Sequence, residues 1–421
     1  MDTADPSQEL IGLNQLFVFL GVADQGSVRR SAETLYRASS AVSRSIQQLE
    51  RLLEVSLFER RGQGMLLTSA GERVQQRGLR IAADLEWVRA DAVSQAQASS
   101  AVAPVSALFH TRRLQLASML YDVRHITTVA LQTGLTQPAV SSAIAKLEAS
   151  LGKALFYRSA RGLIPTESAE KWMLAFKRVL AELRAIRADV GALKGVLEGE
   201  VTVGCLPMAR SNILPVAITK LLAQHPALRI KTLESPYGEL CAGLLSGDVD
   251  FIVGALRPLR DASLTTAPLL TENLVAIARS GHPLAEREDL TLKDLLAYPW
   301  VMSRSFTPLR STMDSYFTRR GLKPPHPSVE TADLAMLRGL LIHSDMVTIL
   351  SRHQLSYEIE TGGLRVFPVI LSDFERVIGV TTRSASQLTP GAQRLLAEIQ
   401  AVCDRLSGQK ESGLINRFEQ R

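Results

Sequence analysis

The chain has 421 residues, of which 46% are hydrophobic and 21% are charged, a composition typical of a soluble globular protein. This length is enough for about three domains, and no apolar run approaches the roughly 18 residues of a membrane span. The opening segment MDTADPSQEL lacks the basic and then apolar pattern of a signal peptide, and the three cysteines form no CxxC pair. We therefore expect a cytoplasmic protein.

The net charge of +6 is concentrated in the first half of the chain. Residues 1–197 contain 24 Lys and Arg against 18 Asp and Glu, whereas residues 198–421 contain 24 of each. A basic half is suited to a polyanion such as nucleic acid. Uneven solvation of two domains would give the same imbalance, so charge alone leaves both interpretations open.

A tandem repeat occupies this basic half. ASSAVSRSIQQLERLLEVSLFER (38–60) and TQPAVSSAIAKLEASLGKALFYR (136–158) align at a constant offset of 98 residues. The identities in this register include Val42/Val140, Ile46/Ile144, Glu50/Glu148, Leu57/Leu155, Phe58/Phe156 and Thr68/Thr166. So many identities in one register indicate a duplication.

Each copy is expected to fold as a helix-turn-helix. In the first copy, LNQLFVFLGVADQ (13–25) has apolar residues at helical spacing, and SVRRSAETL predicts a short helix after it. SSAVSRSIQQLERLLE predicts a second amphipathic helix, whose polar face carries Ser39, Ser40, Ser43, Arg44 and Gln47. In the major groove of DNA, Ser and Gln bond base edges and Arg reads guanine. These residues are therefore candidate DNA contacts.

A β-hairpin wing is expected after this helix. LFERRGQGMLLT places glycines between two apolar strand-like pieces. Arg60 and Arg61 would lie there near phosphates, where contacts position a domain on DNA. An ordinary helical hairpin is the alternative for one copy, but two copies with the same wing and a basic balance favour DNA binding.

These motifs resemble the winged helix-turn-helix of LysR-type transcriptional regulators, in which GS…AA..L..SQPAVS..I..LE..LG..LF.R……LT..G is usual. The first copy departs from this string at Ser39-Ser40, where the family has Gln-Pro, and the second at Arg124-His125 and Ala169, where it has Gly-Ser and Gly. The candidate DNA contacts of the second copy are Gln137, Pro138, Ser141, Ser142, Lys146, Arg158 and Arg161. Whether both copies touch DNA stays open, because one copy could act only in oligomerisation.

A long helix is expected after each copy. GERVQQRGLRIAADLEWVRADAVSQAQ predicts the first, SSAVAPV (99–105) a linker, and residues from about 167 to 195 the second. Amphipathic helices of this length need a partner that buries their apolar stripe. In LysR-type regulators the corresponding helix pairs two subunits, so the resemblance implies a homodimer or homotetramer. Packing on the chain's own domains is the alternative.

The second half alternates strands with helices, which predicts βαβ units and a mostly parallel sheet. In such sheets small ligands bind beyond the carboxyl ends of strands, by helix N-termini. The candidate effector-binding residues at such places are Pro207, Met208, Arg210, Ser211, Ser303, Arg304, Thr307 and Thr331. Ser211 and Thr307 are equally well placed as plain helix N-caps, so that alternative stays open.

This half also resembles the effector-binding domain of LysR-type regulators, itself similar to two-lobed periplasmic binding proteins. The resemblance rests on the segments LLSGDVDFIVGAL and GHPLAEREDLTLKDLLAYPWVM. Their sequences most resemble the subgroup of the galactose-binding-protein regulator. The expected architecture is α/β multidomain. Its parts are a first winged helix-turn-helix (10–72), a helix and linker (73–108), a second winged helix-turn-helix (109–168), a linker or dimerisation helix (169–197), a two-lobed effector domain (198–405, with lobe I at 198–263 and 367–405 and lobe II at 264–366), and a polar tail (406–421).

The expected function is sequence-specific DNA binding and transcriptional regulation under control of a small-molecule effector, with no cofactor, metal or membrane partner. An enzyme is the alternative from another class, because two-lobed α/β folds also host catalysts. The sequence contains no HExxH, GxSxG or P-loop motif, which favours a protein that is not an enzyme.

Overall fold

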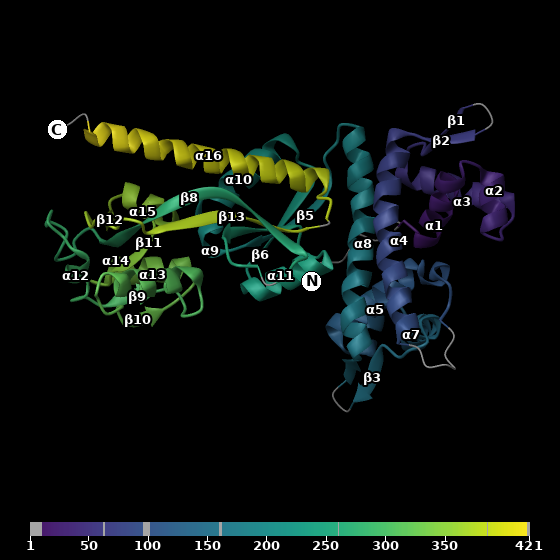
Figure 1. Ribbon diagram of the computed structural model, residues 1–421, viewed down its shortest axis with the longest axis horizontal. Helices are drawn as coiled ribbons and strands as arrows, with labels where there is room; N and C mark the ends of the chain where they lie inside the picture. Colours follow the sequence, from purple (N-terminus) through teal and green to yellow (C-terminus); the bar gives the residue numbers. More distant parts are fainter. Residues whose placement is uncertain are drawn as a thin grey trace.

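The computed structural model describes residues 11–61, 64–95, 102–159, 162–259, 261–384 and 386–418. A helical part formed by the first half lies beside an α/β part formed by the second half (Figure 1). The helical part contains two units with the same order of elements. The first unit consists of α1 (Leu13–Gln25), α2 (Val28–Thr34), α3 (Ser39–Leu53), β1 (Phe58–Arg61) and β2 (Gly64–Leu67), and it leads into the long helix α4 (Ser69–Ser94). A short 3-10 helix, η1 (Val105–Leu108), then precedes the second unit, which consists of α5 (Thr111–Val123), α6 (Ile126–Thr133), α7 (Gln137–Leu151), β3 (Phe156–Ser159) and β4 (Gly162–Pro165), and leads into α8 (Glu167–Leu193).

The two units repeat the same stabilising hydrogen bonds at the offset of 98 residues. Glu50 Oε1 accepts from the backbone N–H of Leu57 at 2.8 Å, and Glu148 Oε1 accepts from that of Leu155 at 2.7 Å. Each carboxylate thus ties the end of its helix to the start of the hairpin. Replacement of either by an apolar residue would leave a backbone N–H unpaired.

The long helices begin in the same way in both units. Thr68 and Thr166 are the N-caps, and their side chains accept from backbone N–H groups three residues on, each at 3.1 Å. An oxygen in this position satisfies one of the free donors at a helix N-terminus. The duplication seen in the sequence is therefore preserved in the local structure.

The helix α8 packs antiparallel against α4 of the same chain, with the two helices side by side (Figure 1). One continuous hydrophobic core includes both units and both long helices. Its fully buried members on the long helices include Val74, Ile81, Leu85, Val88, Trp172, Phe176, Val179 and Ile186. The apolar stripe of α8 is therefore covered by α4 within the chain, as in the alternative of packing on the chain's own domains, and pairing of two subunits through α8 stays a prediction.

The α/β part is built on a seven-stranded sheet with strand order β11-β8-β13-β7-β5-β6, and β12 also pairs with β8. Its strands are β5 (Gly199–Cys205), β6 (Leu228–Leu233), β7 (Phe251–Ala255), β8 (Leu264–Arg279), β11 (Thr348–Ser351), β12 (Leu364–Val366) and β13 (Glu375–Arg383). The strand pairs β5–β6 and β5–β7 are parallel, whereas β8, β11, β12 and β13 pair antiparallel. The expectation of a mostly parallel sheet is therefore wrong beyond β5–β7, because β8 and β13 run as long antiparallel neighbours.

Helices and a small second sheet complete two lobes. The first lobe carries α9 (Pro207–Ser211), α10 (Ile213–Gln224), α11 (Tyr237–Ser246) and α16 (Pro390–Phe418). The second carries α12 (Leu292–Leu295), β9 (Trp300–Met302), α13 (Pro308–Arg319), β10 (Pro327–Glu330), α14 (Leu334–His343), η2 (Arg352–Leu355) and α15 (Ser356–Glu360). The strand β8 joins them, since its first ten residues pair with β13 and its last six with β11 and β12. The helix α16 continues to Phe418, through the tail that the sequence leaves unassigned.

Candidate nucleic-acid interface and effector cavity

The helix α3 separates its side chains as the sequence predicts. Val42, Ile46 and Leu49 are buried against the core, at spacings of three and four residues. On the other side, Ser39, Ser40, Arg44 and Gln47 are exposed and Ser43 is half-buried. A polar helix face of small residues with one Arg can approach a major groove closely.

The helix α7 presents a matching face. Gln137, Pro138, Ser142 and Lys146 are exposed and Ser141 is half-buried. The two faces share four positions at the offset of 98 residues. At each of these positions the side chain on α3 and the side chain on α7 are equally exposed or half-buried. The two faces are thus alike in shape and differ in chemistry, most clearly where Arg44 of α3 corresponds to Ser142 of α7.

Four basic side chains of the two faces and hairpins have no acidic partner within the described part of the chain. Arg44, Lys146, Arg60 and Arg158 are exposed, and none forms an ion pair with another residue of the described ranges. The backbone of Arg61 lies in β1, but its side chain is outside the description, and Arg161 lies outside the described residues. Four unpaired cations on the hairpins and outer helices are suited to phosphate oxygens.

The turn between α2 and α3 carries a residue that the sequence patterns did not select. Tyr36 is 96% exposed and has a φ of 52°, a left-handed conformation that bulky side chains rarely adopt. The equivalent residue of the second unit is Gly134, with a φ of 65°. An exposed aromatic ring beside the outer face of α3 adds an apolar and hydrogen-bonding surface there. Its signal in the sequence is an aromatic residue in a turn where the copy has glycine.

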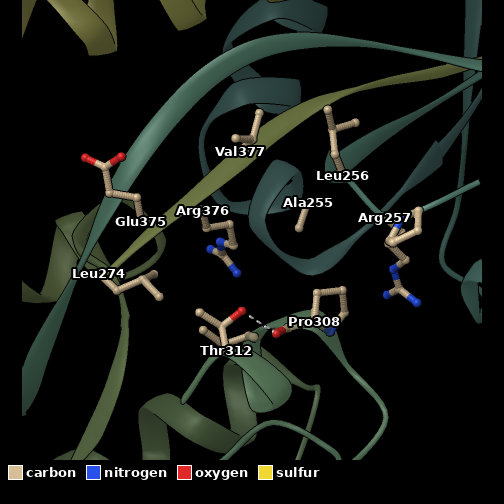
Figure 2. A pocket seen from close by; sticks show the side chains of 11 residues that line it. Ala255, Leu256, Arg257, Leu274, Pro308, Thr312, Glu375, Arg376 and Val377 are labelled. Carbon is tan, nitrogen blue, oxygen red and sulfur yellow. Dashed lines mark hydrogen bonds between the residues drawn. The ribbon is translucent and has the colours of Figure 1, made fainter. Parts of the chain in front are cut away.

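A cavity of about 370 Å³ lies between the two lobes of the α/β part. Its walls come from the segment that follows β7, from the first turns of α13, and from β8 and β13 where they cross between the lobes (Figure 2). The lining residues are Ala255, Leu256, Arg257, Pro258, Leu274, Pro308, Leu309, Thr312, Glu375, Arg376 and Val377. The size suits a small organic molecule, and most of the lining is apolar.

Two arginines supply the positive charge of the cavity. Arg376 donates to Glu272 Oε1 at 2.7 Å and to Gln354 Oε1 at 3.1 Å, so its charge is balanced inside the protein. Arg257 lies 4.5 Å from the centre of the Tyr237 ring, and within the described residues its Nε has no hydrogen-bond partner. Burial lowers the pKa of Arg257. Arg257 is therefore the cation of the cavity that a bound anion can pair with.

None of the eight residues selected from the sequence lines this cavity. Thr307 caps α13, and its hydroxyl donates to Ser303 Oγ at 2.9 Å. The sequence therefore predicts the correct end of α13, but the predicted residue, Thr307, lies one residue before the lining begins at Pro308. Arg304 is exposed, and Thr331 Oγ1 accepts from the N–H of Asp333.

The other four selected residues lie on α9. Pro207 begins this helix, and Met208 is buried in the core of the first lobe. Arg210 is half-buried, and Ser211 donates to the carbonyl of Met208. Ser211 is not an N-cap, because Asn212 holds that place before α10, whereas Thr307 is one. Arg257, which the selection missed, follows the carboxyl end of the strand DFIVGAL, so the same rule could have found it.

The described residues limit what the site can hold and where the chain can lie. No cluster of three His, Cys, Asp or Glu side chains suited to a metal ion occurs among them. Within the same residues, no helix is long and apolar enough to cross a membrane.

Comparison with known protein families identifies the two parts. The profile of the bacterial regulatory helix-turn-helix protein of the lysR family matches residues 13–72 and again 111–170, and that of the LysR substrate binding domain matches residues 194–404. The chain belongs to the LysR family. It is accordingly a transcriptional regulator that joins DNA-binding helix-turn-helix sequence to an effector-binding domain.

Individual relatives agree with this assignment. The HTH-type transcriptional regulator GalR of Pseudomonas putida is 45% identical over 94% of this chain and 98% of its own length. The regulator GbpR of Azospirillum brasilense is 28% identical over 70% of this chain and 86% of its length. The GalR match is too long to leave out either helix-turn-helix segment. Relatives named as regulators are consistent with a LysR-family protein that is not an enzyme.

Solved structures of the family share the fold. A full-length OxyR variant from Pseudomonas aeruginosa is 22% identical with a TM-score of 0.54, and it covers 70% of this chain and 94% of its own. CbnR, a LysR family transcriptional regulator, is 17% identical with a TM-score of 0.51, and it covers 70% of this chain and 99% of its own. At these identities the likeness concerns the fold alone.

Proposed function

We propose that both units of this LysR-family regulator bind duplex DNA, each with its outer helix in the major groove and its hairpin along the backbone. The observation that carries this proposal is the agreement between the two faces, which keep the same burial at equivalent positions. A copy retained only for oligomerisation would have no need to keep an exposed polar face with an unpaired cation.

The residues of the two faces divide into base and phosphate contacts. Arg44 is suited to guanine and Gln137 to adenine, with Ser39, Ser40, Ser43, Gln47, Pro138, Ser141, Ser142 and Lys146 around them. Arg60 and Arg158 on the hairpins are suited to phosphates, as are Arg61, the next residue after Arg60, and Arg161, three residues after Arg158. This division supports winged helix-turn-helix domains near residues 10–72 and 109–168.

We propose that the cavity between the lobes binds a small organic anion with an apolar body. Arg257 supplies a guanidinium whose Nε has no hydrogen-bond partner among the described residues, and Leu256, Leu274 and Leu309 supply apolar walls. Because the walls come from both lobes, a ligand there favours one relative placement of the lobes over others. Binding thus biases an equilibrium between existing states of the regulator.

We also propose that copies of this protein associate with one another, but not through the apolar stripe of α8. The resemblance implies a homodimer or homotetramer in the cytoplasm, but the apolar stripe of α8 is covered by α4 of its own chain. Copies of this protein would therefore associate through other surfaces. The effector domain, near residues 198–405, is the larger part of the chain left for that role.

The test measures the affinity of the full chain for a duplex selected from random sequences, with and without a panel of aliphatic and aromatic carboxylic acids. We expect specific binding, and we expect at least one acid to change the affinity of wild type while leaving that of Arg257→Met unchanged. Arg365→Met serves as the control, because Arg365 lies on β12, away from the cavity lining. Absence of sequence-specific binding by wild type would refute the DNA part, and an unaltered response of Arg257→Met would refute the cavity part.

A further inference from the structure

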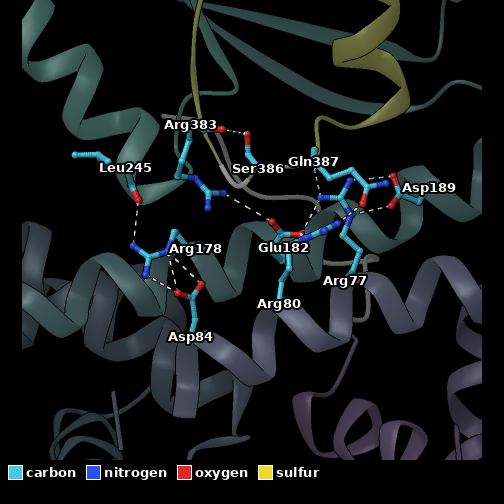
Figure 3. Close-up of polar contacts among 10 residues, drawn as sticks. All are labelled: Arg77, Arg80, Asp84, Arg178, Glu182, Asp189, Leu245, Arg383, Ser386 and Gln387. Atoms are coloured by element: carbon cyan, nitrogen blue, oxygen red, sulfur yellow. Dashed lines mark hydrogen bonds and ion pairs between the residues drawn. The ribbon is translucent and has the colours of Figure 1, made fainter. Parts of the chain in front are cut away.

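The contacts between α4 and α8 are reciprocal at the offset of the repeat. Arg80 Nε of α4 lies 3.4 Å from Glu182 Oε2 of α8, and Arg178 Nε of α8 lies 3.1 Å from Asp84 Oδ1 of α4 (Figure 3). Arg178 is the residue 98 places after Arg80, and Glu182 is 98 places after Asp84. The same ion pair is therefore made twice, once in each direction.

Two further contacts share equivalent acceptors, although their donors are not equivalent residues. Trp172 Nε1 donates to Asp91 Oδ2 at 2.7 Å, while Arg77 Nε donates to Asp189 Oδ2 at 2.8 Å. Asp91 and Asp189 are again equivalent residues, and each accepts from the first half of the opposite helix. Along these contacting pairs the residue numbers rise on α4 while they fall on α8, so the two helices are antiparallel.

One contact joins a pair of equivalent residues directly. The backbone N–H of Leu13 donates to Thr111 Oγ1 at 2.8 Å, and these residues are themselves 98 places apart. Two equivalent residues touch each other only close to a two-fold axis. In oligomers, an interface where residue i meets j and j meets i is the mark of a two-fold dimer. Here that arrangement is made by the two halves of a tandem repeat.

The pseudo-two-fold places the two units apart. The hairpin β1–β2 lies toward one end of the α4–α8 pair and β3 toward the other (Figure 1). Because the shared core runs through both units and both helices, the units are held in one arrangement and are not independent domains on a linker.

We propose that a single chain reads two neighbouring DNA half-sites, in inverted orientation and of unequal sequence. The proposal rests on the DNA binding proposed above and adds the number and arrangement of sites read by one chain. In two-fold DNA-binding dimers the half-sites are about 10 base pairs, or a multiple of that, apart. The pseudo-two-fold of α4 and α8 supplies the corresponding arrangement within this protein.

The half-sites are unequal because the two outer faces differ. Arg44 on α3 is matched by Ser142 on α7, and Ser39 by Gln137. Arg favours guanine and Gln favours adenine, so the two faces select different bases. An operator with two unequal half-sites is asymmetric, so the chain binds it in one orientation.

The direction extends to the effector domain. One effector domain serves two units, and Arg77 of α4 donates to the carbonyl of Gln387, in the segment between β13 and α16. The equivalent residue on α8 is Ala175, which has no such donor. A chain bound to its unequal half-sites therefore points its effector domain toward a defined side of the operator.

The test uses the full chain with duplexes selected from a random stretch of about 40 base pairs, enough for about four helical turns. Mass measurement of the complex counts the chains per duplex, and hydroxyl-radical footprinting counts the protected half-sites. We expect two half-sites per chain, whatever the number of chains bound. We also expect Arg44→Ala to weaken protection of one half-site about ten-fold, and Gln137→Ala with Lys146→Ala to do so at the other.

The outcomes separate this inference from the function on which it rests. One half-site per chain, or both variants weakening the same half-site, would overturn the inference and leave DNA binding intact. Failure of wild type to protect any selected sequence would overturn the proposed DNA binding itself. The substituted side chains are exposed, and an unchanged circular dichroism spectrum shows that each variant is folded.

Discussion

Replacing Arg77 by Met is expected to lower the free energy of unfolding by about 3–5 kcal/mol, the usual cost of removing one partner from a buried ion pair. The Arg77 side chain is 2% exposed, and it bonds both oxygens of Asp189, at 2.8 and 3.1 Å. Its Nη1 also donates to Glu182 Oε2 and to the carbonyl of Gln387, each at 2.8 Å (Figure 3). Met fills similar space but leaves the buried Asp189 carboxylate without its cation, whereas Glu182 keeps Arg80 and Arg383.

The pKa of Arg77 agrees with this role. Burial lowers the pKa, the Asp189 and Glu182 carboxylates raise it, and the net shift is upward. The carboxylates thus outweigh burial, and the charge of Arg77 is held in place by its partners.

The measurement is the urea concentration at the midpoint of unfolding, with unfolding monitored by circular dichroism. Arg89→Met is the control, because Arg89 pairs with Glu86 on the surface of the same helix, where such pairs contribute about 0–1 kcal/mol. A variant that combines Arg77→Met with Asp189→Asn is expected to regain part of the loss, since Asp189 then carries no unpaired charge and Glu182 keeps Arg80 and Arg383. An Arg77→Met midpoint equal to that of wild type would contradict the role assigned to this cluster.

Replacing Arg44 by Glu is expected to weaken binding to a selected duplex by more than about 100-fold. The change removes a base contact of about 1–3 kcal/mol and places a carboxylate next to the phosphates, a repulsion of several kcal/mol. Arg44 is exposed and forms no ion pair within the described part of the chain, so its loss has no direct structural cost.

The affinity is measured by fluorescence anisotropy at one fixed salt concentration, because phosphate contacts make it strongly salt-dependent. Arg365→Glu is the matched control, since it makes the same charge change on a half-exposed arginine of the effector domain. If the two variants bind DNA equally well, the outer face of α3 does not contact DNA.

Much of the helical part could be predicted from the sequence because each helix and hairpin there is determined by residues that are close together in the chain. The apolar stripe of α3, the hairpin after it and the long helix beyond are all set by residues within a few turns of one another. The partner of α8 was not predictable in the same way, since any apolar surface of the right length could cover its stripe. The reciprocal residues Arg80/Arg178 and Asp84/Glu182 were the available signal, visible only once the repeat offset is applied to charged pairs.

The cavity was less accessible to sequence reasoning. The rule that ligands bind at strand ends and helix N-termini led to Thr307, one residue from the lining at Pro308. Arg376 and Leu274 lie instead within two strands that cross between the lobes, and they meet only because β8 and β13 pair antiparallel. A pairing of strands about 100 residues apart leaves no local pattern in the chain.

A cross-link between α4 and α8 tests most directly that one chain holds its own pair of DNA-reading units. Gln95 Oε1 accepts from Ser168 Oγ at 2.8 Å, so cysteines introduced by Gln95→Cys and Ser168→Cys in one full-length chain lie within reach of a short bismaleimide cross-linker. The parent protein, whose Cys205 and Cys403 are buried and whose Cys241 is partly exposed, is the control for unwanted cross-links. We predict that the linked variant, in which both introduced thiols are consumed, migrates as a single chain on a denaturing gel. Migration as two linked chains would mean that α4 of one copy packs on α8 of another, which would contradict the account.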